Sequence, residues 1–185
     1  GLDNNWYLDG NNASVVSSDG NKTTVQMGSG YRGDLWLARS GKGKIVNVTP
    51  ADYRYFAIKV GFKSQLVPGK NKPNGCIKLE IFDDGIKKIG PEYFGTGGDA
   101  NNRYEILGAS EISTTEPNVL YYDLQSKYKT VTPTDWNQVF DLSQCKFVIA
   151  DFPETAQTYD LYWIRSFKSV EELQAFVDSE NNTNE

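Results

Sequence analysis

Apolar side chains recur at every second position in short runs of this chain, and turn-forming residues separate the runs. The clearest run covers residues 53–62, where Phe56, Ile58, Val60 and Phe62 share one parity. This spacing is that of the side chains on one face of a β-strand. Helical periodicity is nearly absent before the C-terminal segment. The pattern therefore predicts an all-β fold, a two-sheet antiparallel sandwich.

Turn signals divide the rest of the chain in the same way. Asp19-Gly20-Asn21 and Gly28-Ser29-Gly30 are typical of hairpin turns. At the far end of the chain, Tyr159, Leu161, Trp163 and Phe167 are predicted to share one strand face, which assigns Trp163 to the core. Further strands are predicted over residues 12–18, 22–27, 31–38, 44–48, 76–82, 119–124, 146–152 and 160–167.

One short α-helix is predicted at the C-terminus, over residues 169–180. Ser169 and Glu172 form a capping box, in which a hydroxyl and a carboxylate accept hydrogen bonds from unpaired amides. Residues 181–185 are polar and are predicted to fray. We expect the helix to pack against the open end of the sandwich, through an apolar stripe of Val170, Leu173, Phe176 and Val177.

Length and charge narrow the class of protein. A chain of 185 residues suits a single domain over 1–185. The formal net charge of -5 disfavours nucleic acid as a partner, because phosphate neutralisation needs a basic face. No run approaches the roughly 18 apolar residues of a membrane-spanning helix. Gly1 is an unusual natural start, so we expect that a signal segment has been removed and that neighbouring domains can exist.

Residue types common in catalytic sites are either absent from this chain or do not follow the spacing of a known catalytic motif. The chain has no histidine, which removes the commonest acid–base group and metal ligand. Cys76 and Cys145 have no CxxC spacing and suit buried thiols, with a disulfide left open. No catalytic residue is predicted. A glycosidase would need a pair of carboxylates facing each other, for which the candidates include Asp34, Glu92, Asp99, Glu105, Glu111 and Asp151.

Two segments are rich in oxygen ligands of the kind that calcium prefers. They are residues 9–12 and 99–102, each made of Asp and Asn with one small residue. Neither has the spacing of a calcium-binding helix–loop–helix, and side chains of these types cap turns routinely. No cofactor is predicted, and a structural calcium ion stays open.

Aromatic residues make up 13% of the chain, more than a two-layer core needs. Many lie in turn-rich stretches, where they can meet a partner from solvent. A sugar offers an apolar C–H face that a flat ring covers, and a rim of hydroxyls that arginine and amides bind. The predicted ligand contacts are Trp6, Trp36, Tyr93, Arg103, Tyr104 and Trp136.

Two segments carry a resemblance to known families. Residues 159–173, from Tyr159 to Leu173, resemble the closing strand and helix of uncharacterised domains in secreted or surface lipoproteins of gut Bacteroidetes. Residues 53–62 are similar to a central strand of galactose-binding-like carbohydrate-binding modules. The resemblance implies a jelly-roll topology, export to the cell surface and association with polysaccharide utilisation. A concanavalin-like sandwich is the alternative architecture.

Three hypotheses for function follow. The first is a non-catalytic module of an exported protein that binds an oligo- or polysaccharide by stacking aromatic rings on sugars. The second is a protein–protein or spacer module of a multidomain surface assembly, which predicts a flat exposed apolar patch. The third is a glycoside hydrolase, which requires two carboxylates facing each other across a cleft.

Overall fold

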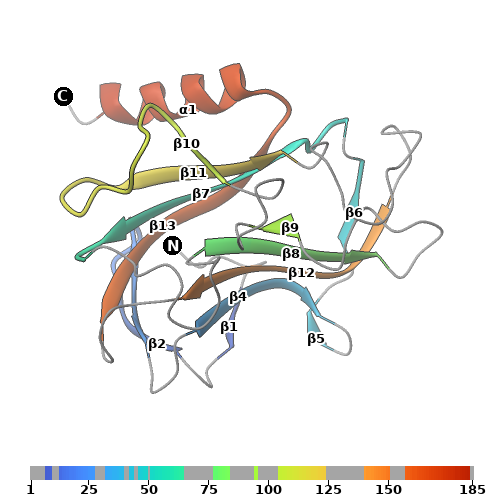
Figure 1. Cartoon of the computed structure of the whole chain (residues 1–185), viewed down its shortest axis with the longest axis horizontal. Coiled ribbons are helices and arrows are strands. Elements are labelled where there is room, and N and C mark those ends of the chain that lie inside the picture. The colour runs from blue at the N-terminus through green and yellow to red at the C-terminus, as the bar shows by residue number, and fades with distance from the viewer. Residues whose placement is uncertain are drawn as a thin grey trace.

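The computed structural model confirms the predicted antiparallel β-sandwich with one C-terminal helix (Figure 1). Two sheets pack face to face, and the helix lies outside them. Among the described residues, no helix has both the length and the apolar character to cross a membrane. The structure describes residues 7–9, 13–27, 32–39, 42–43, 46–49, 51–64, 77–83, 94–95, 104–123, 140–150 and 157–183.

The first sheet has seven described strands, and its main path runs in the order β1-β4-β12-β8-β9. The two short strands β5 and β6 pair with β4 and β12. The sequence prediction missed β1, β5, β9 and the first half of β12. The strand bounds are β1 Tyr7–Asp9, β4 Arg32–Arg39, β5 Lys42–Gly43, β6 Val46–Val48, β8 Ile77–Asp83, β9 Phe94–Gly95 and β12 Phe140–Ala150.

The second sheet has six described strands in the order β10-β11-β7-β13-β3-β2. From β4 onward, each long strand lies in the opposite sheet from the long strand before it. All of these strands except the two-residue β10 were predicted within a few residues. Their bounds are β2 Ala13–Ser18, β3 Thr23–Met27, β7 Tyr55–Phe62, β10 Glu105–Ile106, β11 Asn118–Asp123 and β13 Thr158–Phe167.

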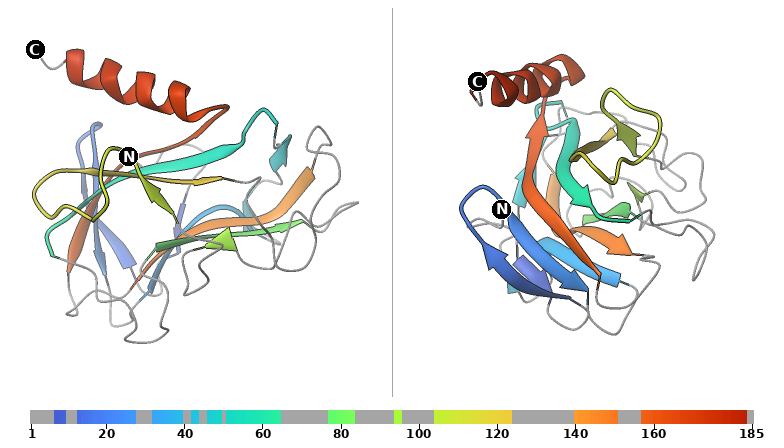
Figure 2. Two further views of the ribbon diagram at one scale, coloured as in Figure 1. Left: turned by 45° about the horizontal axis from the view of Figure 1, so that its top comes forward. Right: turned by 90° about the vertical axis from the view of Figure 1, so that its left-hand side faces the viewer.

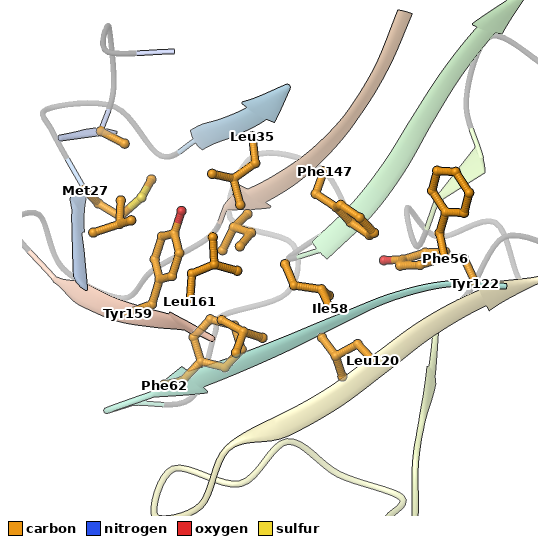
Figure 3. Packing of buried hydrophobic residues seen from close by; sticks show 14 residues of the cluster. Met27, Leu35, Phe56, Ile58, Phe62, Leu120, Tyr122, Phe147, Tyr159 and Leu161 are labelled. Atoms are coloured by element: carbon orange, nitrogen blue, oxygen red, sulfur yellow. The ribbon is translucent and has the colours of Figure 1, made fainter. Parts of the chain in front are cut away.

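The main core fills the space between the two sheets (Figure 3). The predicted face of β7 is confirmed, because its four apolar side chains from Phe56 to Phe62 are all buried there. The opposite sheet contributes Leu35 and Phe147, and the Phe147 ring lies 5.8 Å from the ring of Tyr122 on β11. Rings from both layers therefore interlock at the centre of the sandwich.

A bulge in β13 changes which side chains face the core. Leu161 pairs with Val60, but Trp163 pairs with Lys59, so Tyr162 is an extra residue in the ladder. One inserted residue moves the following side chains to the other face. Tyr159 and Leu161 enter the core between the sheets as expected. The prediction that Trp163 and Phe167 share that face was wrong, because both belong to a cluster on the outer side.

The helix α1 (Val170–Asn182) covers that outer side rather than an open end of the sandwich (Figure 2). Its one buried residue, Leu173, packs with Ala57 and Val119 of the sheet. The outer faces of β7 and β11 are apolar at these positions, which explains why a helix is needed there. Glu180 completes the contact by accepting a hydrogen bond of 2.9 Å from the Trp163 indole.

The ends of α1 follow the predicted capping with two differences. The amide of Glu172 donates to the Ser169 hydroxyl at 3.1 Å, as expected of a capping box. The Glu172 carboxylate instead accepts from the amide of Lys168, also at 3.1 Å, one residue before the cap. The helix continues to Asn182, two residues beyond its predicted end at residue 180.

Candidate functional site

The predicted ligand contacts do not come together in the described part of the chain. Trp36 is 5% exposed and lies on the outer face of the seven-stranded sheet, since the neighbouring Leu35 points into the core. The Lys146 ammonium lies 4.3 Å from the centroid of the Trp36 ring. Trp36 is therefore enclosed in this structure and offers no open ring face. The remaining predictions, apart from Tyr104, lie outside the described residues: Trp6, Tyr93, Arg103 and Trp136.

Tyr104 lies at the margin of the core between the sheets. It is half-buried, and its ring is 6.2 Å from that of Tyr122. This position is on the opposite side of its sheet from α1 and serves packing.

The other predicted chemical sites are only partly described. Cys76 lies outside the described residues, as do most of the two oxygen-rich segments at 9–12 and 99–102. Within the part of the chain that the structure describes, no three acidic or cysteine side chains are arranged to hold a metal ion. The Cys76–Cys145 disulfide and the structural calcium ion therefore stay hypotheses.

A different cluster of aromatic and charged residues lies on the outer face of the six-stranded sheet, beside the start of α1. The pairing of β7 with β11 sets Tyr55 directly opposite Asp123 and places Tyr121 two residues along the same face. The Tyr55 and Tyr121 rings meet edge to face at 5.9 Å. We call this cluster the tyrosine patch and define it as Tyr53, Arg54, Tyr55, Tyr121 and Asp123.

An ion pair closes one side of the tyrosine patch. Arg54 donates from Nε and Nη2 to the two carboxylate oxygens of Asp123, both at 2.9 Å. The guanidinium carbon also lies 5.1 Å from the centroid of the Tyr55 ring. Two of the five N–H donors of an arginine are engaged in such a fork. The Arg54 side chain is 39% exposed, so the guanidinium still meets solvent.

The tyrosines of the patch differ in exposure. Tyr53 is 45% exposed, the highest value of any described aromatic side chain. Tyr121 is half-buried against the cluster under α1, and the half-buried Tyr55 packs on the Tyr121 ring. The open Tyr53 ring belongs to the residue just before Arg54 in the chain, and the two half-buried rings pack on each other.

Burial and acidic neighbours set the ionisation of the patch. Burial raises the pKa of the Tyr55 hydroxyl, and the Asp123 carboxylate raises it further. Burial also raises the pKa of the Tyr121 hydroxyl, with Glu105 adding to the effect. The hydrogen bond to Asp123 raises the pKa of Arg54. Both phenols thus stay neutral across the physiological range, where they can donate and accept hydrogen bonds.

Sequence reasoning missed this patch because its residues looked architectural. The start of the clearest predicted strand holds Tyr53, Arg54 and Tyr55. The other two members, Tyr121 and Asp123, come from a different predicted strand, and Asp123 is 69 residues after Arg54. One signal was available. Tyr53 and Tyr55 are on the face of the predicted strand that does not point into the core, and Arg54 lies between them in the sequence. A strand face exposed to water usually carries polar side chains instead.

A second polar cluster lies farther along the same sheet. Asp160 on β13 accepts hydrogen bonds from the Thr24 hydroxyl at 2.6 Å and from the Lys22 ammonium at 3.0 Å. Tyr162, the bulged residue, lies over Gly61, where an added Cβ would come 3.6 Å from the Tyr162 ring. Burial raises the pKa of Asp160, but the hydrogen bonds from Thr24 and Lys22 outweigh it, so the pKa is lowered overall.

This cluster predicts how acid destabilises the fold. Because the folded-state pKa of Asp160 lies below its ordinary value of 3.8, its contribution is present above that value and is lost as the pH falls through the folded pKa. Asp160→Asn should cost about 1–2 kcal/mol at neutral pH and flatten the acid limb below about pH 4. Urea unfolding at several pH values measures this. An acid limb that Asp160→Asn leaves unchanged would contradict the assignment.

The fold and the patch define a β-sandwich domain with a surface cluster of tyrosines. Residues 1–173 match the family described as a domain of unknown function (DUF4979), and the chain belongs to this family. No curated protein and no solved structure matches the chain. The family match includes β7, β11 and the start of α1, so the tyrosine patch lies within the shared domain.

Proposed function

We propose that this domain is a non-catalytic glycan-binding module of an exported cell-surface protein and that the tyrosine patch is its binding site. The observation that carries the proposal is the Arg54–Asp123 fork beside an exposed ring. The resemblance to galactose-binding-like modules and to surface lipoproteins of polysaccharide-utilisation systems supports the same assignment.

The chemistry of the patch suits a sugar. The exposed Tyr53 ring can cover the C–H face of a hexose, while Arg54 and Asp123 offer donors and acceptors for its hydroxyls. Tyr55 and Tyr121 hold these groups from behind, since both are fixed by packing. A site built in advance binds with a smaller entropic cost than one that must be ordered on binding.

The same geometry favours binding over catalysis. A glycosidase needs one protonated carboxyl group as general acid and a second carboxylate nearby. The tyrosine patch as defined holds one carboxylate, that of Asp123, and both of its oxygens already accept hydrogen bonds from Arg54. We therefore expect glycan to be bound without hydrolysis.

Affinity electrophoresis through a panel of neutral glucans, mannans, xylans and galactans tests the proposal. We expect retardation by at least one polysaccharide. Tyr53→Ala and Arg54→Ala should each weaken binding by about tenfold or more, since each loses at least about 1.4 kcal/mol of contact. Arg165→Ala is the matched control, because Arg165 is exposed and also stacks on a ring, that of Phe176 at 4.4 Å.

Three results would count against the proposal. Absence of retardation by the whole panel would contradict glycan binding. Unchanged retardation in both patch variants would move the site elsewhere. Release of reducing ends from a retarded polysaccharide would replace binding by catalysis.

The alternative of a protein–protein module has one observation in its favour. Val15 and Val16 on the outermost described strand, β2, are 48% and 56% exposed. Two neighbouring valines are small beside the several hundred Å² of apolar surface that mark an interface. A register shift between Val15 and Ser17 also distorts this edge, which hinders pairing with another chain. Glycan binding is therefore the better supported function.

A further inference from the structure

Carboxylates surround the tyrosine patch more densely than cations do. Glu105 is exposed and lies directly opposite Tyr121 in the pairing of β10 with β11, so the two share one face. Glu171 is exposed in the first turn of α1, and its charge raises the pKa of the Tyr55 hydroxyl, after burial and Asp123. These two carboxylates stand on different sides of the rings, one on the edge strand and one on the helix.

Two described cations next to the patch, Arg54 and Lys168, are already paired with carboxylates. Arg54 is held by Asp123 in the two-bond fork at 2.9 Å. Lys168, just before α1, faces Asp52 with an Nζ to Oδ1 distance of 3.9 Å. None of the ion pairs among the described residues involves Glu105 or Glu171. The described carboxylates around the patch therefore include two, Glu105 and Glu171, that no described cation pairs.

We infer that the tyrosine patch selects uncharged glycans and disfavours glycans that carry carboxylate or sulfate groups. This inference rests on the proposed glycan-binding function. An anionic substituent brought to the rings would meet two glutamates that no described cation pairs, beside an arginine whose guanidinium is already engaged by Asp123. Like-charge contact suppresses unsuitable partners more than it changes the affinity for suitable ones. Because both glutamates are exposed, salt should screen the effect over a Debye length of about 8 Å.

The test compares one polymer in two charge states. The probes are the neutral polysaccharide retarded most strongly in the electrophoresis assay and its carboxymethylated derivative of equal length. Isothermal titration with the intact domain should give affinity for the neutral polymer that is nearly independent of salt. At low ionic strength, the carboxymethylated polymer should bind at least about fivefold more weakly, and high salt should narrow the difference.

Charge-neutral variants assign the selectivity to the two glutamates. The double variant Glu105→Gln/Glu171→Gln should bring the two polymers to within about twofold of each other without changing affinity for the neutral one. The control is Glu116→Gln, an exposed carboxylate in the loop at the other end of β11. It should keep the full discrimination.

The outcomes separate this inference from the proposed function. Equal or tighter binding of the carboxymethylated polymer would overturn the charge selectivity and leave glycan binding in place. Discrimination that persists in the double variant would also overturn it, because the two glutamates would then not be its source. Binding of neither polymer would overturn both the selectivity and the function.

Discussion

Replacement of Phe147 by alanine should lower the free energy of unfolding by about 3–5 kcal/mol, the cost of a large cavity in a packed core. Phe147 is fully buried on β12 and packs against Tyr122 from the opposite sheet at 5.8 Å between ring centroids. It therefore joins the two layers at the centre of the sandwich. Urea denaturation followed by tryptophan fluorescence measures the change.

Tyr53→Ala is the matched control for the loss of a ring from the core. Tyr53 is 45% exposed, so its removal should change the free energy of unfolding by no more than about 0.5 kcal/mol. The same variant should bind glycan about tenfold or more weakly, which separates the role of this ring in binding from any role in stability. A cost below about 1 kcal/mol for Phe147→Ala would contradict the central position of Phe147.

Leu173→Ala should cost about 2–4 kcal/mol, because Leu173 is the one buried residue of α1 and seats the helix on the outer face of the sheet. Its loss opens a cavity over Ala57 and Val119. Thermal unfolding and hydrogen exchange of the helix amides measure the effect. We expect faster exchange across α1, since Leu173 is its one fully buried contact with the sheet.

Gln174→Ala is the control for Leu173→Ala within the same turn. Gln174 is exposed, and its one side-chain hydrogen bond is to Asp178 at 2.8 Å on the helix surface. A pair of this kind contributes about 0.2–0.5 kcal/mol. Equal effects of the two substitutions would show that α1 is not anchored through Leu173.

The fold class was predictable because one pattern dominates the chain. The period-two run of β7 predicted both the strand and the side of it that is buried, and the side chains from Phe56 to Phe62 confirm this. The bulge at Tyr162 was not predictable from the sequence. The apolar pattern of residues 159–167 fits a regular strand as well as a strand with one extra residue. The misplacement of Trp163 and Phe167 followed from that single residue.

The candidate site was less predictable than the fold, for a reason of topology. Arg54 and Asp123 are 69 residues apart, and only the pairing of β7 with β11 brings them together. Ligand contacts were predicted from aromatic residues that lie in turn-rich segments. Trp36 shows why this criterion is weak. Trp36 follows a turn-rich stretch, yet it lies within β4 and is enclosed on the outer face of the sheet.

The most direct test of the proposed binding site is the chemical shift of each tyrosine ring while a retained neutral oligosaccharide is titrated into the domain. We predict saturable shifts at Tyr53, Tyr55 and Tyr121, and none at Tyr159, which is fully buried between the sheets. Shifts confined to rings outside the tyrosine patch, such as that of Tyr93, or no shifts at all, would contradict the account.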